Sequence, residues 1–483
     1  MRAATSLRLG LGILALSCGS ESESPSAGAG GTGAAATELV GAPGVDVTEV
    51  AIYQAVERVL WTEAGAPPAG VPLVAGREAL VRVHYRTSAS YDGTPVTARL
   101  VLDDGKPPLE LEGTPFPVTE RDKLETSINF KIPADRVGDK LTYAVTLGQP
   151  AAGRTENSRA RASGDVVVEG HASTMRVMLV PFAYGADGSG RLPDTSEAEV
   201  ERYRQRLHAL YPVSKVEVSV HAPIDWQGAI SPTGKGWQEV GMRVYQLRQT
   251  ENVPDDVYLY GVFLPTQTLF EFCATGCMLG VTLLNDSPPD VGNVGLRLAL
   301  GVGYPEHGPD TAAHELGHAH GRKHVNCGPG LDPKSIDALY PHSGNTIGDF
   351  GYDLTTGELR DPAVFSDFMG YCEKRWISGY NYSALFQRSQ NVNLPDLLLP
   401  EGTYFDYWLV PVGPRLPSTA FQKVRRRTPL LGGRTVQVNA DGKLVQGRYF
   451  DFDHLDGGWL FVPTSELARA RFEIDGSRFD MTR

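Results

Sequence analysis

Residues 310–324 read Asp-Thr-Ala-Ala-His-Glu-Leu-Gly-His-Ala-His-Gly-Arg-Lys-His. His314 and His318 are four residues apart, so on a helix they project from one face about one turn apart. Two imidazoles at that separation can share one Zn²⁺ ion. Glu315 adjoins the first histidine and is angled so that it reaches a metal-bound water more easily than the metal. The spacing predicts a helix that carries two metal ligands and a general base.

Gly321 explains how a third ligand can reach the same ion. A continuing helix would carry the following residues away from the metal. Because glycine lacks a Cβ, Gly321 can adopt a left-handed conformation, end the helix and redirect the chain. His324 can then turn back as the third ligand. This arrangement leaves one coordination position open, as a catalytic zinc site requires.

The spacing HExxHxxGxxH matches the zinc signature of the metzincin clan of metallopeptidases at every defined position. Members of that clan also need a methionine turn beneath the metal. Residues 366–372, Ser-Asp-Phe-Met-Gly-Tyr-Cys, resemble such a turn, with Met369 as the methionine. The resemblance covers roughly residues 175–390. It implies an α+β fold in which a twisted mixed sheet and an active-site helix hold one catalytic zinc ion.

The resemblance also implies roles for neighbouring residues. In the astacin-like and serralysin-like branches, a tyrosine two places after the methionine ligates zinc or stabilises the tetrahedral intermediate, which makes Tyr371 the candidate here. An edge strand above the metal pairs with the extended substrate in this clan, and residues 279–284 are the candidate. The overall plan is similar to large secreted bacterial metzincins, some of which cut mucins. The implied reaction is hydrolysis of internal peptide bonds in extracellular proteins or glycoproteins.

Two other functions stay open. A non-catalytic surface-binding lipoprotein could retain zinc only as a structural remnant, and activity that disappears in Glu315→Gln would exclude it. An amidase acting on cell-wall peptides would keep the metal chemistry and change the bond that is cut. A structural calcium ion is conceivable, but no acidic cluster has the spacing of a calcium loop.

The spacing of hydrophobic residues divides the rest of this 483-residue chain into regions. Residues 46–165 alternate with a period of two between turn signals, which predicts an antiparallel β-sandwich. Residues 172–393 alternate strands and helices, which predicts the mixed sheet of the catalytic domain. There, Ser196 and Glu199 have the spacing of a capping box at the start of a helix. Residues 394–483 return to short strands and predict a third, β-rich domain.

The N-terminus predicts export. A positive segment precedes the apolar residues 9–16, which are too few to span a bilayer, so residues 1–18 are typical of a signal peptide. Its end resembles a bacterial lipobox, with Cys18 as the lipidated residue; a plain secretory signal with a chance cysteine is the alternative. Residues 19–45 lack large apolar side chains and predict a flexible tether. We expect a cell-surface or outer-membrane lipoprotein, or a freely secreted protein.

Four cysteines remain after Cys18, and an even number in an exported chain suggests disulfides. Three connectivities are possible, and we favour Cys273–Cys277 with Cys327–Cys372, since the second pair joins the segments that follow the two motifs. A cysteine-rich zinc site is the competing interpretation, but no CxxC spacing supports it. The formal net charge of −12 argues against binding to nucleic acid. We expect a monomer that meets a membrane only through a lipid anchor.

Overall fold

The computed structural model describes residues 38–288, 293–392, 402–413, 422–426, 429–440, 443–464, 469–474 and 477–482. The expected signal peptide and lipobox, with Cys18, lie outside the described residues, as does most of the expected tether. Regular structure begins at Leu39, somewhat before the expected start of the sandwich.

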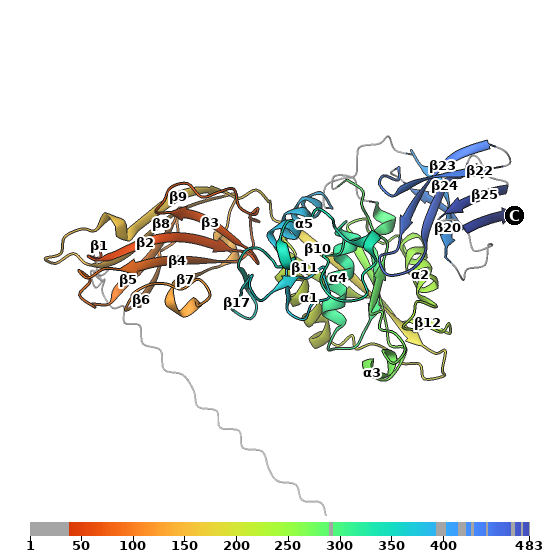
Figure 1. Ribbon diagram of the computed structural model, residues 1–483, viewed down its shortest axis with the longest axis horizontal. Helices are drawn as coiled ribbons and strands as arrows, with labels where there is room; N and C mark the ends of the chain where they lie inside the picture. Colours follow the sequence, from red (N-terminus) through yellow and green to blue (C-terminus); the bar gives the residue numbers. More distant parts are fainter. Residues whose placement is uncertain are drawn as a thin grey trace, which may run out of the picture. The chain divides into compact units, whose positions relative to one another are not determined.

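Antiparallel sheets build the N-terminal region (Figure 1). One sheet has the order β1-β8-β5-β6, with β9 paired to β8, and the other has the order β3-β2-β4-β7. A shared apolar core includes Val81 and Val83 of β4 and Leu100 of β5, as the alternation predicts. The strands are β1 (Leu39–Gly41), β2 (Val45–Tyr53), β3 (Glu57–Thr62), β4 (Ala79–Thr87), β5 (Val96–Leu102), β6 (Leu109–Gly113), β7 (Ile128–Ile132), β8 (Lys140–Pro150) and β9 (Arg161–Val167).

A mixed sheet with helices against it forms the central region, so the fold belongs to the α+β class, as expected. Its strand order is β11-β10-β13-β15-β14, with β12 paired to β10; β14 is antiparallel to β15, and the other pairs are parallel. The strands are β10 (Thr174–Tyr184), β11 (Lys215–Val220), β12 (Ile224–Trp226), β13 (Val257–Phe263), β14 (Gly280–Thr282) and β15 (Leu298–Val302). The helices are α1 (Glu197–Leu210), α2 (Trp237–Thr250), α3 (Leu269–Phe272), α4 (Gly308–Ala319) and α5 (Gly379–Val392).

Short strand pairs follow α4 along the chain. They are β16 (Gly351–Asp353) with β17 (Glu358–Arg360), and β18 (Ser366–Asp367) with β19 (Arg375–Trp376). The pair β18–β19 is parallel and places the expected methionine turn directly after β18.

The C-terminal sheet has the order β21-β20-β24-β23-β22-β25-β26. Its strands are β20 (Phe405–Val412), β21 (Gln422–Arg426), β22 (Arg434–Ala440), β23 (Lys443–Asp451), β24 (Gly458–Pro463), β25 (Arg469–Ile474) and β26 (Ser477–Thr482). The sheet lies beside α2 in Figure 1. Trp459 of β24 makes an edge contact with Tyr245 of α2, with ring centroids 5.2 Å apart. Apolar side chains of the C-terminal sheet therefore share one core with the central sheet.

Candidate metal centre

Helix α4 carries the first two histidines and ends as the sequence predicts. The amide of Arg322 donates to the carbonyl of Gly317 (2.9 Å), and the amide of Gly321 donates to that of His318 (2.8 Å). This pair of bonds is the Schellman motif, which requires a left-handed residue after the helix cap. Gly321 supplies it with φ of +88°, and an added Cβ would lie only 2.8 Å from the carbonyl oxygen of Asn285. The chain therefore turns back at Gly321.

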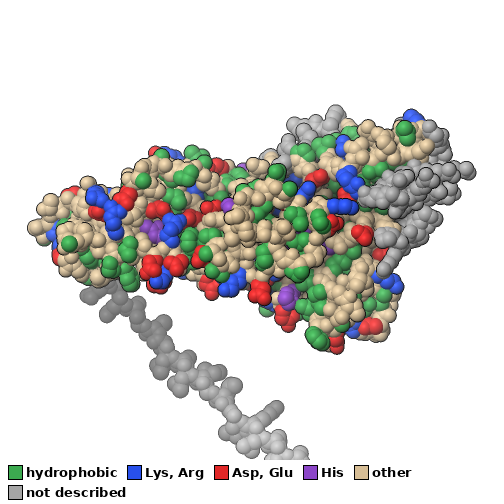
Figure 2. Space-filling view, in the orientation of Figure 1, with side chains coloured by type: hydrophobic (Ala, Val, Ile, Leu, Met, Phe, Trp, Pro, Cys, Tyr) green, Lys and Arg blue, Asp and Glu red, His purple; other side chains and the backbone are tan. Residues whose placement is uncertain are grey.

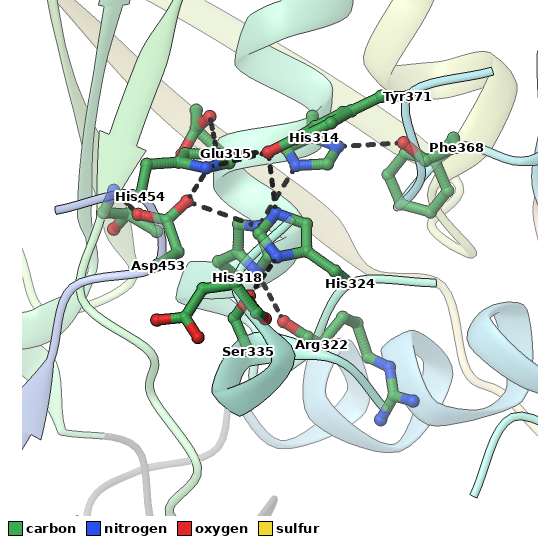
Figure 3. A network of polar contacts seen from close by, with 12 residues as sticks. His314, Glu315, His318, Arg322, His324, Ser335, Phe368, Tyr371, Asp453 and His454 are labelled. Atoms are coloured by element: carbon green, nitrogen blue, oxygen red, sulfur yellow. Dashed lines mark hydrogen bonds and ion pairs between the residues drawn. The ribbon is translucent and has the colours of Figure 1, made fainter. Parts of the chain in front are cut away.

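The turn brings His324 to the histidines of α4, as predicted (Figure 3). The Nε2 atom of His318 lies 3.1 Å from Nε2 of His314 and 3.0 Å from Nε2 of His324. All three side chains are buried, with exposed fractions of 4% or less. The three predicted ligand atoms thus meet at one point in the interior.

The other ring nitrogens identify the tautomers. Nδ1 of His314 lies 2.9 Å from the carbonyl oxygen of Phe368, and Nδ1 of His318 lies 2.6 Å from that of Arg322. Nδ1 of His324 lies 2.7 Å from the hydroxyl of Ser335, whose own proton goes to the carbonyl of Asp332. Each Nδ1 therefore carries a proton and donates it. The three Nε2 lone pairs then face one another.

Burial keeps these rings neutral. It lowers the pKa of His314 to about 3 and holds the pKa values of His318 and His324 below the ordinary range. Buried lone pairs that converge without a proton between them repel one another and need a cation. Neutral imidazoles oriented by a hydrogen bond at the second nitrogen are also the form that binds metal. The residues present therefore fit a metal ion.

Met369 lies under this cluster, where the sequence places the methionine turn. Its side chain is fully buried, and a Cβ added to Gly317 would lie 2.5 Å from its sulfur. The glycine between the two histidines of α4 thus lets the methionine approach the helix. Asp367 holds the turn from within, because its carboxylate accepts from the amides of Met369 (2.8 Å) and Ser378 (3.0 Å).

Glu315 points into the same space. It is 2% exposed, and within the described residues its Oε2 atom has no hydrogen-bond partner. Burial raises the pKa of Glu315 to about 8. The carboxylate packs against Gly280 of β14, since a Cβ there would lie 2.4 Å from Oε1. Glu315 is thus a desolvated carboxylate held next to the convergent imidazoles.

Tyr371 also reaches the centre. Its hydroxyl lies 3.0 Å from Nε2 of His324. The disulfide Cys327–Cys372 joins the two loops that carry these residues, and Tyr371 donates its amide to the carbonyl of Cys327. The other disulfide, Cys273–Cys277, follows α3. Both pairs are those expected, and disulfides favour an oxidising compartment.

Asp453 and His454 enter the centre from the turn between β23 and β24, and the sequence analysis did not predict them (Figure 3). The hydroxyl of Tyr371 lies 2.8 Å from the ring nitrogens of His454. Nε2 of His454 lies 2.9 Å from Oδ2 of Asp453 and 3.5 Å from Oε1 of Glu315. Nothing local marked these residues, because an Asp-His pair in a turn between strands is typical of a solvated loop.

Asp453 is fully buried beside Glu315. Burial and the charge of Glu315 raise the pKa of Asp453 well above its usual range. Its Oδ2 atom lies 3.4 Å from Nε2 of His318, in addition to its 2.9 Å contact with Nε2 of His454. The ligand atoms of His314, His318, His324 and His454 all lie within 4.8 Å of one another. A metal ion would therefore have a fourth histidine within reach.

Three neighbouring histidines, at positions 307, 320 and 342, are not part of this cluster. His320 stacks on Tyr258 (centroids 4.2 Å apart) in the core behind α4. His307 and His342 lie outside the described groups that could hold a metal. In the described part of the chain, no helix combines the length and apolar composition of a membrane span. On the face in Figure 2, basic and acidic side chains lie interspersed.

Comparisons with protein-family models and with curated proteins yield no match to this chain.

Proposed function

We propose that the chain is a zinc-dependent endopeptidase of the metzincin type that hydrolyses internal peptide bonds of extracellular proteins or glycoproteins. One observation carries the proposal: three neutral imidazoles direct their lone pairs to a single point next to a buried carboxylate. The metzincin-like spacing of the same residues adds to it. Imidazole ligands suit zinc, as they also suit copper, iron and nickel, and they do not suit magnesium or calcium.

His314, His318 and His324 would hold the ion. A zinc ion bound there supplies Lewis acidity, which polarises a carbonyl group and acidifies a water molecule. The hydrogen bonds to Phe368, Arg322 and Ser335 fix the three rings. Such partners orient metal ligands and make them more basic.

Glu315 serves as the general base. A nearby cation favours the charged form of a carboxylate and so lowers the pKa that burial has raised to about 8. A carboxylate poised near neutral pH can accept the proton of the attacking water and return it to the leaving amine. Its unpartnered Oε2 atom is free for this transfer.

Tyr371 stabilises the developing negative charge. Its hydroxyl lies 3.0 Å from Nε2 of His324, so it would lie within reach of the carbonyl oxygen of a peptide bound beside the histidines. A hydrogen-bond donor that meets an oxyanion in a dry site contributes about 10²–10³ in turnover.

The test is cleavage of a mixed peptide library by the zinc-loaded protein, with Glu315→Gln as the matched variant at equal zinc occupancy. We expect cleavage that disappears with the carboxylate. Cleavage that survives in Glu315→Gln would contradict the role of Glu315, and zinc that binds without His314 and His318 would contradict the site.

A non-catalytic zinc protein is the second candidate, and one observation favours it. Structural zinc sites are closed by protein ligands, and His454 lies where it can close this one. A structural site has no use for a buried carboxylate beside the metal ligands, such as that of Glu315, which favours the enzyme.

A further inference from the structure

We infer that residues 451–454 block the active site of their own chain. In this arrangement His454 is a fourth metal ligand, which a substrate must displace. The inference rests on the proposed function. It concerns the turn between β23 and β24, which joins the C-terminal sheet to the metal centre (Figure 3).

The main chain of this segment binds the free edge of β14. Leu284 donates its amide to the carbonyl of Asp451 (3.0 Å), and Asp453 donates its amide to the carbonyl of Thr282 (3.1 Å). Between them, Leu283 and Phe452 form an antiparallel bridge. Segment 451–453 therefore adds to the sheet as an extended peptide would, by β-augmentation.

The side chain of Asp453 completes the pairing. Its Oδ1 atom accepts from the amide of Thr282 (2.9 Å), so both main-chain groups of Thr282 on this edge are used. Another extended chain can pair with this edge only after the turn has left it. The C-terminal half of the expected substrate strand, residues 282–284, is thus covered by the protein itself.

His454 follows directly and faces the cluster. Its ring lies 4.8 Å from that of His324 between centroids, and Tyr371 contacts it at 2.8 Å. Its ligand atom belongs to the same compact group as those of the three predicted ligands. Four imidazoles satisfy the tetrahedral preference of zinc. A ring in that place occupies the position that a water or a scissile carbonyl needs.

The residues that pair with the edge of β14 and the fourth histidine belong to one segment. A substrate therefore gains access to the strand edge and to the metal at the same time. While the turn is docked, the metal is closed and the strand edge is covered. Withdrawal of the turn uncovers both together. The folded chain therefore has low activity until a substrate or partner competes for β14 and displaces the turn.

The experiment loads the full chain with Co²⁺, whose visible absorption reports its ligands, and titrates it with azide. We expect azide to leave the wild-type spectrum unchanged and to alter that of His454→Ala. Loss of the ligand should also weaken Co²⁺ affinity by at least about tenfold. His171→Ala removes an exposed histidine and should behave like the wild type. If the alanine variant does not fold, His454→Phe retains the ring volume without a ligand atom.

An equal azide response in wild type and variant, or an unchanged Co²⁺ affinity, would overturn the ligand assignment. Peptide cleavage by zinc-loaded His454→Ala should exceed that of the wild type, and Glu315→Gln in the same background should abolish it. Slower cleavage by His454→Ala would overturn occlusion and make His454 part of turnover. If the cobalt results hold and no variant cleaves, the ligand stands and the proposed function fails.

Discussion

At the scale of single residues, small side chains set the distances in the metal centre. Gly317 admits the sulfur of Met369 beneath the histidines, and Gly280 admits the carboxylate of Glu315 beside them. Neither glycine has a positive φ, so their backbones would tolerate other residues. Their value lies in the missing Cβ, which allows close approach of a functional group.

Gly280→Ala should therefore impair turnover without removing the metal. The new methyl group would lie 2.4 Å from Oε1 of Glu315, and such overpacking costs about 1–3 kcal/mol. If the carboxylate moves away, the peptide cleavage rate falls by about tenfold or more, while zinc stoichiometry stays the same. Gly113→Ala, which enters open space at the end of β6, is the matched control. Unchanged turnover in Gly280→Ala would show that Glu315 has room to adjust.

His84 makes the stability of the metal-free chain depend on pH. Burial, then the charges of Arg82 and Arg121, lowers its folded-state pKa to about 3. Below the unfolded pKa of about 6.5, only the unfolded chain takes up this proton, so the stabilising contribution present above that pH is lost as pH falls. At pH 4.5 the loss is about 3 kcal/mol.

Urea unfolding of wild type and His84→Gln at pH 7 and 4.5 tests this point. We expect the variant to lose about 3 kcal/mol less over that interval. His171→Gln, at an exposed position, should follow the wild type. Parallel losses in all three proteins would refute the role of His84.

At the scale of elements, the sequence predicts those features that are determined by interactions between residues close together in the chain. Ser196 caps α1 by accepting from the amide of Glu199 (3.4 Å), as predicted. The reciprocal half of the expected capping box is replaced, because the Glu199 carboxylate pairs with Arg202 (2.7 Å). The helix that carries the two histidine ligands, and its end at a glycine, were predicted from residue spacing alone. Strand β15 gave no distinct signal, since a short apolar run does not distinguish strand from helix.

The disulfide Cys327–Cys372 should contribute more to stability than Cys273–Cys277. It closes a loop of 45 residues against one of 4. The chain-entropy model gives about 4 kcal/mol for the long loop and about 2 kcal/mol for the short one. Thermal or urea unfolding of the two double-serine variants measures the difference. Equal losses would show that the long loop is already ordered in the unfolded chain.

At the scale of the whole molecule, the sequence could not reveal which distant segments meet. His454 lies more than a hundred residues after the predicted ligands, and no pattern around it differs from an ordinary turn. Its arrival depends on the packing of the C-terminal sheet against α2 through Trp459 and Tyr245. The β-rich character of residues 394–483 was predictable from periodicity, but their shared core with the central sheet was not.

Trp459→Ala should destabilise the whole protein. The indole is fully buried between Tyr245 and Phe452, and loss of such a side chain costs about 3–5 kcal/mol. We expect a lower unfolding free energy for the central and C-terminal sheets together, in one transition. Leu444→Ala, at a position 67% exposed in the adjacent β23, should change it by less than about 0.5 kcal/mol. Separate transitions for the two sheets would contradict a shared core.

The pairing of residues 451–453 with β14 also bears on solubility. An uncovered strand edge presents a row of main-chain donors and acceptors that a second molecule can adopt, and native proteins cover such edges to prevent aggregation. The turn that we propose closes the metal centre would therefore also keep neighbouring copies from joining through β14. A chain whose turn has withdrawn would expose the edge of β14 to other copies at the same moment that it exposes the metal centre. The time for which it stays monomeric and open would therefore shorten as the protein concentration rises.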